Sequence, residues 1–592
     1  MTHRDRPRWH WWVLLAGSAG AMVFGVWGFL DYDQLALAEA QPLFRGQHLA
    51  RAFYETLQLF ALHAPHFERS MNIPLYVACY LATIVSLWTV LGIFQRVYST
   101  ELHHFRLSYY RNHVVICGAG WRGLALARDY SSREGERRGD KVVVIERDPH
   151  APGLQVCDEL GVPYVLADAS DPRALRAAGA GRARLLIATC TDDGLNLKIA
   201  LNARQIVESF RPQDGPLKCY IQLSNRYLRT MARQKHLIAD SRGRIEISTV
   251  GLDVYENGAR RLFNRYPLDW RPIRHDSPLQ ALLLIFGLGD MGESVLLQAA
   301  RIGHFANRRR LRIIVVDREA TKRQAELKSR YPRLGDICDV EFHNLDVNDP
   351  TLIAWAEHMS GEAQSLATLV LSLPGDALNL ALALNLGQSD GVRANGCQIR
   401  VRMSSNSGLA ALLSETRQRE LFGDQIRPFG MLEEACNKEA LEETQLDALA
   451  RGIHADYVAQ QAKSGQAAPY GVAWEDLSEE AKGSNRDAAD HIEIKLRAVG
   501  LRSVNQGDAA EPVTEFSPEQ IEVLARMEHE RYCAQRMLAG WTPGPKRDVV
   551  KKTNPTLVPW ADLSEAERKK DSDQVQLIPR ILAAVGRSIR AG

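Results

Sequence analysis

The sequence has almost no net charge and no paired cysteine motif. Its 592 residues carry a formal net charge of +2, so bulk electrostatics predicts no nucleic-acid partner. No CxxC pair occurs and the number of cysteines is odd, which argues against a zinc site or a disulfide framework. We therefore expect a reducing compartment and buried, unpaired thiols at Cys79, Cys117, Cys157, Cys190, Cys219, Cys338, Cys397, Cys436 and Cys533.

Charged residues are missing from two long segments near the N-terminus, residues 11–30 and 71–94. Each can cross about 30 Å of hydrocarbon as a helix, so residues 1–100 are expected to form a membrane region with spans at about 11–30 and 73–94. Arginines precede the first span and follow the second, which predicts a cell (inner) membrane protein with both termini in the cytoplasm. A signal peptide cleaved near residues 36–38 is the alternative, and the long apolar run disfavours it.

Glycine is absent from residues 47–91, and this range includes the loop between the spans. Residues 53–62 are mostly apolar and compatible with a helix, so segment 47–70 has the layout of a pore loop. A potassium filter needs a glycine-rich strand whose carbonyls replace the water of the ion, and this sequence contains none there. Two readings stay open: an interfacial helix in a simple anchor, or a less selective pore ringed by Glu55, His63, His66 or Glu68.

Glycine is concentrated instead in a loop that follows an apolar strand. Residues 113–117 lead into Gly118, Gly120 and Gly123 at GxGxxG spacing, then a helical stretch, a second strand and Glu146. Such a loop lets a phosphate approach backbone amides at the positive end of a helix, and the acid can bind ribose hydroxyls. This order predicts a Rossmann-type nucleotide-binding domain.

The same pattern recurs one domain length further along the chain, which indicates a duplication. A strand over 281–286 precedes a second glycine motif, and a strand over 313–316 ends in an acid. The second copy also has an acid in its glycine loop, Asp290, which is repulsive beside a phosphate. We expect two tandem α/β domains at 101–275 and 276–405, with matched candidate residues Asp168 in the first copy and Gly287, Gly289, Gly292, Asp317 and Asp346 in the second.

Residues 112–205 resemble the N-terminal subdomain of RCK (regulator of potassium conductance) domains, also called Trk-N domains. The runs 168–172, 183–188 and 192–196 carry the resemblance, and residues 280–386 resemble it more loosely. The resemblance implies a potassium-channel-like protein, tetrameric rings below a pore, and gating by NAD(H) or another adenine nucleotide. It places the pyrophosphate at the glycines, the ribose at Glu146 or Asp317, and the adenosine end at Asp168 or Asp346. The alternative is a degenerate scaffold without a ligand.

Strand patterns stop near residue 405, and the remaining sequence is polar and helical. Residues 454–460 match 529–535, and residues 474–480 match 560–566. Ser478 and Ser564 have the sequence context of helix N-caps. These matches predict a mostly α tandem domain, with units at 406–505 and 506–592.

The second unit resembles the RyR domain, the repeat first named in ryanodine receptors. His529, residues 540–544 and residues 557–559 carry this resemblance over about 517–585, and residues 448–500 resemble a diverged partner. Cations beside aromatic rings suit a nucleobase with phosphates, such as a signalling nucleotide. The alternative is a core role for the tryptophans, which we favour for Trp560 and leave open for the loop of Trp541. The candidate ligand residues are Tyr532, Arg536, Trp541, Arg547 and Lys552.

Together these features predict a ligand-gated ion channel or pore-forming effector in the lipid bilayer, with a small nucleotide as its ligand. Binding would move the helix after Phe94, with Gly92 as a candidate hinge. Analogy alone adds a role in antiviral defence signalling. A membrane-tethered sensor without a pore is the second hypothesis. An NAD-dependent oxidoreductase is the third, and no catalytic constellation supports an enzyme.

Overall fold

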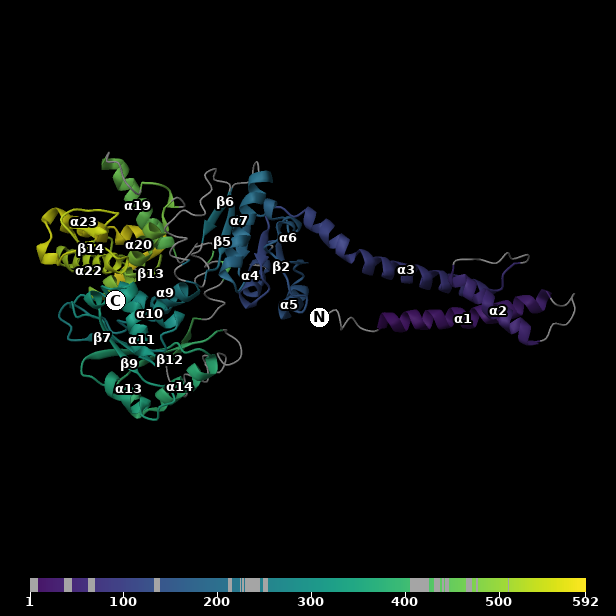
Figure 1. Ribbon diagram of the computed structural model, residues 1–592, viewed down its shortest axis with the longest axis horizontal. Helices are drawn as coiled ribbons and strands as arrows, with labels where there is room; N and C mark the ends of the chain where they lie inside the picture. The colour runs from purple at the N-terminus through teal and green to yellow at the C-terminus, as the bar shows by residue number, and fades with distance from the viewer. Residues whose placement is uncertain are drawn as a thin grey trace.

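The computed structural model describes residues 9–36, 45–61, 70–132, 139–210, 216–223, 225, 228, 245–248, 254–404, 425–430, 437–438, 441, 447–464, 471–474, 477–508 and 511–592. The molecule is elongated, with a helical stalk at one end (Figure 1). A first sheet lies next to the stalk, and a second sheet lies beyond it together with the C-terminal helices.

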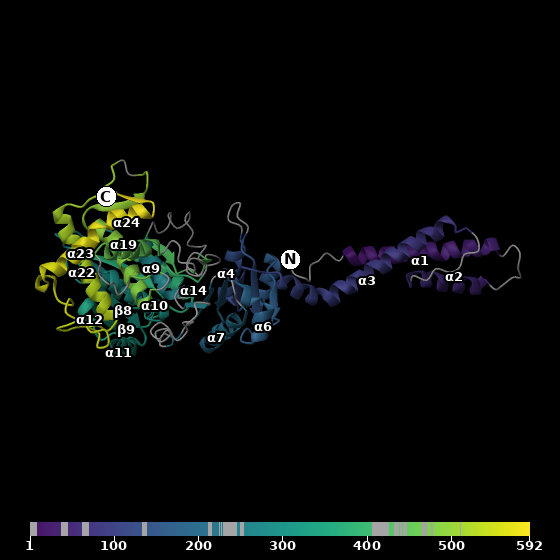
Figure 2. The ribbon, with the colours of Figure 1, turned by 90° about the horizontal axis from the view of Figure 1, so that it is seen from above.

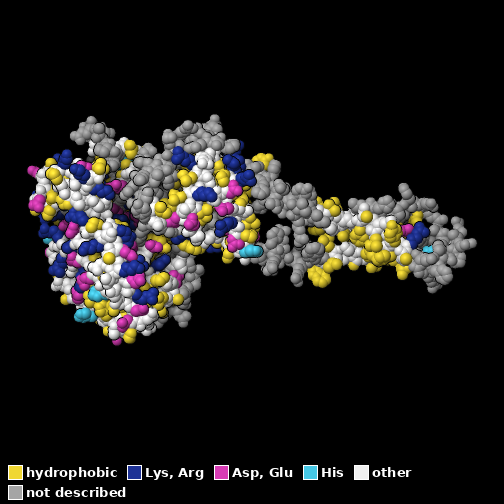
Figure 3. Space-filling model, in the orientation of Figure 1, with side chains coloured by type: hydrophobic (Ala, Val, Ile, Leu, Met, Phe, Trp, Pro, Cys, Tyr) yellow, Lys and Arg dark blue, Asp and Glu magenta, His cyan; other side chains and the backbone are white. Residues whose placement is uncertain are grey.

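The stalk contains two helices long and apolar enough to cross a membrane. They are α1 (Trp9–Ala36) and α3 (Ile73–Ser108), with candidate spans Trp12–Tyr32 and Ile73–Leu91. Only 22% and 17% of these windows are buried, so neither is the core helix of a water-soluble domain. Figure 3 shows hydrophobic side chains gathered on this hairpin. Both predicted spans are therefore present as exposed apolar helices.

Small residues on α1 let the two spans approach closely. A Cβ on Gly17 would meet a Val85 methyl at 3.0 Å, and one on Gly28 would meet the Leu75 backbone nitrogen at 2.8 Å. Glycine at such contacts is typical of helix pairs in membranes, because apolar side chains gain no hydrophobic driving force in lipid.

The predicted re-entrant segment forms α2 (Arg45–Phe60), which packs beside α1 and α3. Thr56 and Leu59 face the other helices and are buried, whereas Tyr54 is exposed. Glu55 forms an ion pair with Arg51 on the same helix at 2.9 Å. The other pore candidates, His63, His66 and Glu68, lie outside the described residues. One buried face is compatible with both readings of this helix, the pore loop and the interfacial anchor.

The third stalk element is notable for its length. α3 has 36 residues, about 54 Å at the rise of an α-helix, so it exceeds the hydrocarbon thickness by about 24 Å. It is continuous through Gly92 and ends beside the first sheet, where Leu107 is 1% exposed and belongs to the core of that domain. Figure 2 shows the same continuity from a second direction.

The first sheet has six parallel strands in the order β3-β2-β1-β4-β5-β6, which is the Rossmann order. Val, Ile and Leu fill its central strands because helices cover both faces. The strands are β1 (Val114–Cys117), β2 (Val142–Glu146), β3 (Tyr164–Leu166), β4 (Leu185–Ala188), β5 (Leu217–Ile221) and β6 (Ile245–Ser248). The helices between them are α4 (Trp121–Ser131), α5 (Pro152–Leu160), α6 (Pro172–Ala177) and α7 (Asp193–Phe210).

The second sheet repeats that topology, with parallel strands in the order β9-β8-β7-β10-β11-β12. The predicted duplication is therefore confirmed at the level of the fold. The strands are β7 (Gln280–Phe286), β8 (Arg312–Asp317), β9 (Asp339–Asn344), β10 (Ser365–Leu371), β11 (Gln398–Arg402) and β12 (Ile426–Phe429). The helices are α9 (Val254–Arg265), α10 (Asp290–Ile302), α11 (Ala320–Arg330), α12 (Leu334–Ile337), α13 (Leu352–Ser360), α14 (Asp376–Gln388) and α15 (Asp390–Ala394).

The C-terminal region consists of two similar helical units whose last strands pair antiparallel. The ring nitrogen of His454 bonds to the Val472 carbonyl at 2.8 Å, and His529 bonds to the Val558 carbonyl at the same distance. The first unit contains α19 (Ala448–Ser464), α20 (Glu479–Asp490), α21 (Ile492–Ala498) and β13 (Leu501–Asn505). The second contains α22 (Pro518–Leu538), a short 3-10 turn (Trp560–Asp562), α23 (Glu565–Gln576), α24 (Ile578–Ala584) and β16 (Arg587–Ala591).

The second sheet and the C-terminal units share one hydrophobic core. Buried side chains of α10, such as Val295, belong to the same cluster as Ile492, Met527 and Leu582 from the C-terminal helices. A buried ion network reinforces the contact, since Arg260 of α9 pairs with Asp490 at 2.7 Å. A ligand bound in the C-terminal units therefore acts on a body that already contains the second sheet.

Candidate functional site

The first glycine loop connects β1 to α4 with the geometry that a phosphate site requires. Gly118 has φ +103°, which only glycine adopts without strain. A Cβ on Gly123 would lie 1.9 Å from the Gly118 carbonyl oxygen, so this position needs glycine for the helix to approach the loop. A Cβ on Gly120 would meet nothing within 4 Å, so the amide end of α4 is accessible. These features agree with the predicted pyrophosphate position.

The predicted acids of the first copy lie at the carboxyl edge of the same sheet. The Oε2 atom of Glu146 accepts a hydrogen bond from the Ala119 amide at 2.7 Å, so the carboxylate touches the glycine loop. A ribose hydroxyl would compete with that amide for the same oxygen. Asp168 accepts a bond from the Ser170 amide at 2.8 Å, and this bond lowers the pKa of its carboxyl. Asp168 is therefore a carboxylate at neutral pH.

The second glycine loop has nearly the same backbone. Gly287 has φ +89°, and a Cβ on Gly292 would lie 2.1 Å from the Gly287 carbonyl oxygen. Gly289 has open space where its Cβ would be. The Asp317 carboxylate accepts from the Leu288 amide at 2.8 Å, the counterpart of the bond between Glu146 and Ala119. Asp346 accepts from the Asn348 amide at 2.9 Å, the counterpart of Asp168.

The two copies differ in charge at the start of the helix. In the first copy α4 begins with Trp121, which is 48% exposed, and the Arg122 guanidinium lies 4.4 Å from its ring centroid. In the second copy α10 begins with the exposed Asp290. A cation and an aromatic face suit a nucleotide, whereas a carboxylate at this end repels its phosphates. The first copy is therefore the better candidate for an anionic ligand.

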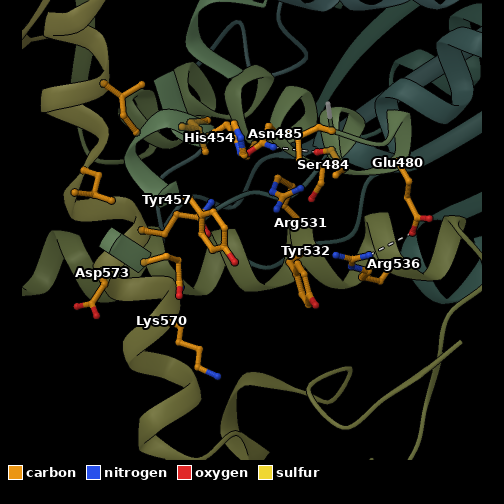
Figure 4. A pocket seen from close by; sticks show the side chains of 18 of the residues that line it. His454, Tyr457, Glu480, Ser484, Asn485, Arg531, Tyr532, Arg536, Lys570 and Asp573 are labelled. Atoms are coloured by element: carbon orange, nitrogen blue, oxygen red, sulfur yellow. Dashed lines mark hydrogen bonds and ion pairs between the residues drawn. The ribbon is translucent and has the colours of Figure 1, made fainter. Parts of the chain in front are cut away.

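A cavity of about 460 Å³ lies between the two C-terminal units. It is lined by α19 and α20 from the first unit and by α22, α23 and α24 from the second. Tyr457 and Tyr532, which occupy matching positions of the sequence repeat, both line it, and Figure 4 shows them among the lining side chains with Arg531. The volume falls within the range of small-molecule sites.

Arg531 supplies a buried cationic donor to this cavity. Its side chain is 2% exposed and its Nη2 atom pairs with Glu528 at 2.7 Å. Glu528 also pairs with the Lys495 ammonium at 2.7 Å, so Arg531 and Lys495 both contact this one carboxylate. Burial opposes ionisation of Glu528, but these two cations outweigh it and lower its pKa. The buried Arg531 Nη1 has no hydrogen-bond partner within the described residues, and an anionic ligand would satisfy it.

The structure separates the five predicted residues of the RyR-like unit. Tyr532 and Arg536 line the cavity. Trp541 is 4% exposed and does not line the cavity. The Arg536 guanidinium lies 5.3 Å from the centroid of its ring. Arg547 lies 6.0 Å from the Trp541 ring centroid, and the Lys552 ammonium donates to the Ala539 carbonyl at 2.8 Å. The last three residues therefore shape the loop beside the cavity.

Sequence reasoning missed Tyr457 as a site residue, and it counted Arg531 only as one of several basic residues around the aromatic rings. Tyr457 matches Tyr532 within the repeat, so a signal was present. Arg531 matches Asp456 of the first unit, and nothing in the pattern shows that its guanidinium is buried. Among the described residues, no three His, Cys, Asp or Glu side chains come together in a group able to hold a metal ion.

His529 is a buried histidine on α22 of the second unit. Its Nδ1 atom lies 3.4 Å from Asp571, and its Nε2 atom faces the Val558 carbonyl at 2.8 Å. Burial lowers the pKa of this imidazole, but the hydrogen bonds to Asp571 and its neighbours outweigh burial and raise the pKa to about 10. The ring is therefore an imidazolium at neutral pH.

This pair predicts a pH-dependent stability. A histidine whose pKa is raised on folding stabilises the folded state fully below its ordinary value of 6.5, and that contribution disappears as pH rises toward 10. Asp571→Asn is expected to lower the unfolding free energy by about 2 kcal/mol at pH 7 and by much less at pH 10. Thermal unfolding of both proteins in detergent at the two pH values measures this difference. A deficit that is the same at both pH values would contradict the assignment.

Two family models match the chain. The TrkA-N domain model matches residues 114–212, which contain the first glycine loop. The RyR domain model matches residues 513–591, which form the second C-terminal unit. The chain carries a TrkA-N domain and a RyR domain. Both resemblances inferred from the sequence are confirmed. The open glycine loop therefore belongs to the TrkA-N domain, and the RyR domain contributes one wall of the cavity.

Part of the chain is similar to a potassium-efflux system protein, and the fold aligns with structures of GsuK. It is 29% identical over 163 residues to the glutathione-regulated potassium-efflux system protein KefC of Enterobacter sp. (strain 638), which covers 26% of this chain. The match spans about a quarter of that protein, 24% of its length. A structure of GsuK bound to ADP aligns with a TM-score of 0.37 at 16% identity, over 73% of this chain and 98% of that chain. A GsuK channel bound to NAD aligns with a TM-score of 0.35 at 13% identity, over 86% of each chain.

Proposed function

We propose that the chain forms an ion path through the membrane that a nucleotide opens or closes from the cytoplasmic side. The observation that carries the proposal is the continuity of α3. One helix runs from the candidate span Ile73–Leu91 to Leu107 in the core of the TrkA-N domain. A change in the position of that domain therefore reaches the membrane through a rigid rod and not through a flexible linker.

The proposed ligand is NAD(H) or another adenine nucleotide at the first glycine loop. The free space at Gly120, the amide end of α4 and the acids Glu146 and Asp168 support it. Both acids favour ribose hydroxyls over a 2′-phosphate. The second loop carries Asp290 in addition, so we assign it a scaffold role.

The inter-repeat cavity is proposed as a second nucleotide site. Tyr457 and Tyr532 offer aromatic faces, and Arg531 and Arg536 offer cations. Ligands bias a two-state equilibrium only through different affinities for the two states, so each site needs a geometry that changes with the stalk. The cavity is lined by both units of the repeat, so a ligand held by both would favour one arrangement of the pair.

Several parts of the proposal rest on resemblance. A ring of four copies would surround the ion path with four α1–α3 hairpins, and both chain termini would face the cytoplasm of an inner membrane. The domain families and the match to KefC support an ion transport role. Neither the described residues nor the similar proteins support a defence role.

A membrane-tethered sensor without a pore is the second candidate, and the exposed α2 favours it. Phe53 and Tyr54 are 48% and 62% exposed, as an interfacial helix would have them. An oxidoreductase has less support, because a glycine loop on a Rossmann-type fold does not by itself supply hydride-transfer chemistry.

Ion flux through liposomes separates these candidates. The full chain is reconstituted and potassium release is followed with and without NAD, NADH, ADP or ATP. The proposal expects at least one nucleotide to change the flux severalfold, and Glu55→Gln to alter the basal flux. The matched control is Glu362→Gln, an exposed carboxylate of the second sheet unit. Absence of flux under every nucleotide would favour the tethered sensor.

A further inference from the structure

A second, larger cleft lies between the second sheet unit and the RyR domain. Its volume is about 710 Å³. One wall is the segment after α10, residues 303–310, together with α12. The other wall is the middle of α22 and residues 557–561. No residue of the glycine loops or of the inter-repeat cavity lines it.

The cleft is strongly basic. Among the described residues, two carboxylates line it, Asp336 and Glu530. Asp336 forms an ion pair with Arg333, three residues earlier in the chain, at 2.8 Å. Burial raises the pKa of Glu530 to about 7, so this side chain is partly neutral at physiological pH. Six arginines from both walls line the cleft with these two acids: Arg308, Arg309, Arg310, Arg333, Arg526 and Arg568. Arg310 and Arg526 also pair with Asp339 and Glu522, which lie outside the lining.

Several of these guanidinium groups have donors or charge that the protein leaves unmatched. The Arg568 guanidinium donates to the Trp560 and Ala561 carbonyls at 3.1 and 2.7 Å, which fixes its position without neutralising it. The buried Arg333 Nη1 has no hydrogen-bond partner in the described part of the chain. Arg309 is exposed and forms no ion pair with any described residue. Fixed cationic donors that converge from two walls suit phosphate oxygens.

Backbone conformation supports a built site. Arg308 has φ +59°, a conformation that non-glycine residues rarely adopt, and it lies at the turn that presents three successive arginines. An asparagine or glycine would take this turn at lower cost, as Gly161 does after α5. The sequence therefore places an arginine at a position where its charge, and not its backbone preference, explains the residue.

Position and size define the class of ligand. α22 lies at the end of the molecule opposite α2, with the first sheet between them (Figures 1 and 2), so a lipid headgroup is out of reach. A cleft of 710 Å³ holds a small molecule and not a polymer. We infer that this cleft binds a small polyanion with at least two phosphate groups, at a site separate from both nucleotide sites proposed above.

Such a ligand would join the two walls. Arg309 belongs to the second sheet unit and Arg568 to the RyR domain, so a phosphate chain held by both strengthens the contact between these parts. Binding at this contact does not depend on whether the membrane region conducts ions.

Titration calorimetry of the full chain in detergent, with sodium tripolyphosphate as the probe, tests the site. Arg309→Glu is expected to weaken binding about tenfold or more, and Arg309→Ala with Arg568→Ala to weaken it further. Arg393→Glu is the matched control, because Arg393 is a half-exposed arginine of the same sheet unit outside the cleft. It should leave the affinity unchanged. Thermal unfolding of each variant shows that it is folded.

A second titration with ATP separates two sources of the phosphate chain. Tighter binding of ATP than of tripolyphosphate, lost in Arg309→Glu, indicates a nucleoside polyphosphate. Equal or weaker binding of ATP indicates that the chain of phosphates is itself the ligand. Both results support the site. Failure of both probes to bind at millimolar concentration, or equal affinities in Arg309→Glu and Arg393→Glu, overturns it.

Discussion

Alanine in place of Gly123 is expected to disrupt the first glycine loop, whereas alanine in place of Gly120 is expected to leave the fold intact. A Cβ added at Gly123 would lie 1.9 Å from the Gly118 carbonyl oxygen, and both groups are fixed to the backbone, so the helix and the loop must separate. We expect Gly123→Ala to cost about 3 kcal/mol in the stability of the TrkA-N domain. Hydrogen exchange of residues 114–131 measures that loss.

Gly120→Ala is the matched variant that isolates binding. Gly120 has φ −67°, which alanine adopts freely, and its Cβ would enter open space at the amide end of α4. That space is where a pyrophosphate approaches the backbone, so nucleotide affinity should fall about tenfold without loss of stability. Calorimetric titration with NAD and ADP provides the measurement. Unchanged affinity for a nucleotide that binds the native chain would place the ligand elsewhere.

The second large effect is expected at the buried ion network between α9 and the first C-terminal unit. The Arg260 side chain is 5% exposed and pairs with Asp490 at 2.7 Å and with Asp447 at 3.1 Å. Arg260→Ala leaves buried carboxylates without their main partner and should cost about 4 kcal/mol. Gln298 donates to Asp490 at 3.0 Å but adds no charge, so it cannot compensate.

Two further variants separate this network from ordinary surface pairing. Arg393→Ala breaks an exposed ion pair and should cost about 0.3 kcal/mol. Arg260→Leu combined with Asp490→Leu should recover much of the loss, because Asp447 keeps Arg486 at 2.6 Å and no unpaired charge remains at Asp490. Urea unfolding of the detergent-solubilised chain gives the free energies. A double variant no more stable than Arg260→Ala would falsify the electrostatic account.

Local sequence patterns predicted most of the fold. The glycine motifs, the alternation of strands with helices and the final acids define both Rossmann units, and the two sheets have the same strand order. The predicted N-caps are also confirmed, since Ser478 and Ser564 each accept a hydrogen bond from a backbone amide three residues on. Asn196 and Asn379 are matched by sequence. Each side chain accepts a hydrogen bond from a backbone amide in the loop after the preceding strand, from Cys190 and from Leu373 respectively. These features depend on a few neighbouring residues, which is why sequence carries them.

The sites between units could not be predicted, because long-range packing creates them. The repeat identified Tyr457 with Tyr532, but the cavity exists only because two units pack against each other. Arg260 and Asp490 are 230 positions apart, and their pairing follows from the docking of α20 on α9. Trp541, in the loop that follows α22, is buried, which local aromatic and basic composition does not show.

We propose that α3 transmits ligand binding to the membrane as a rigid rod. Seven glycine and serine residues inserted between residues 98 and 99 remove that rigidity, whereas seven alanine-rich helix-forming residues keep it, because they add about two turns and preserve the phase of the helix. Nucleotide affinity and nucleotide-dependent potassium flux are measured for both insertions in liposomes. The account predicts equal affinities, a flux that still responds in the helical insertion and a flux that no longer responds in the flexible one. A response that survives the flexible insertion would contradict it.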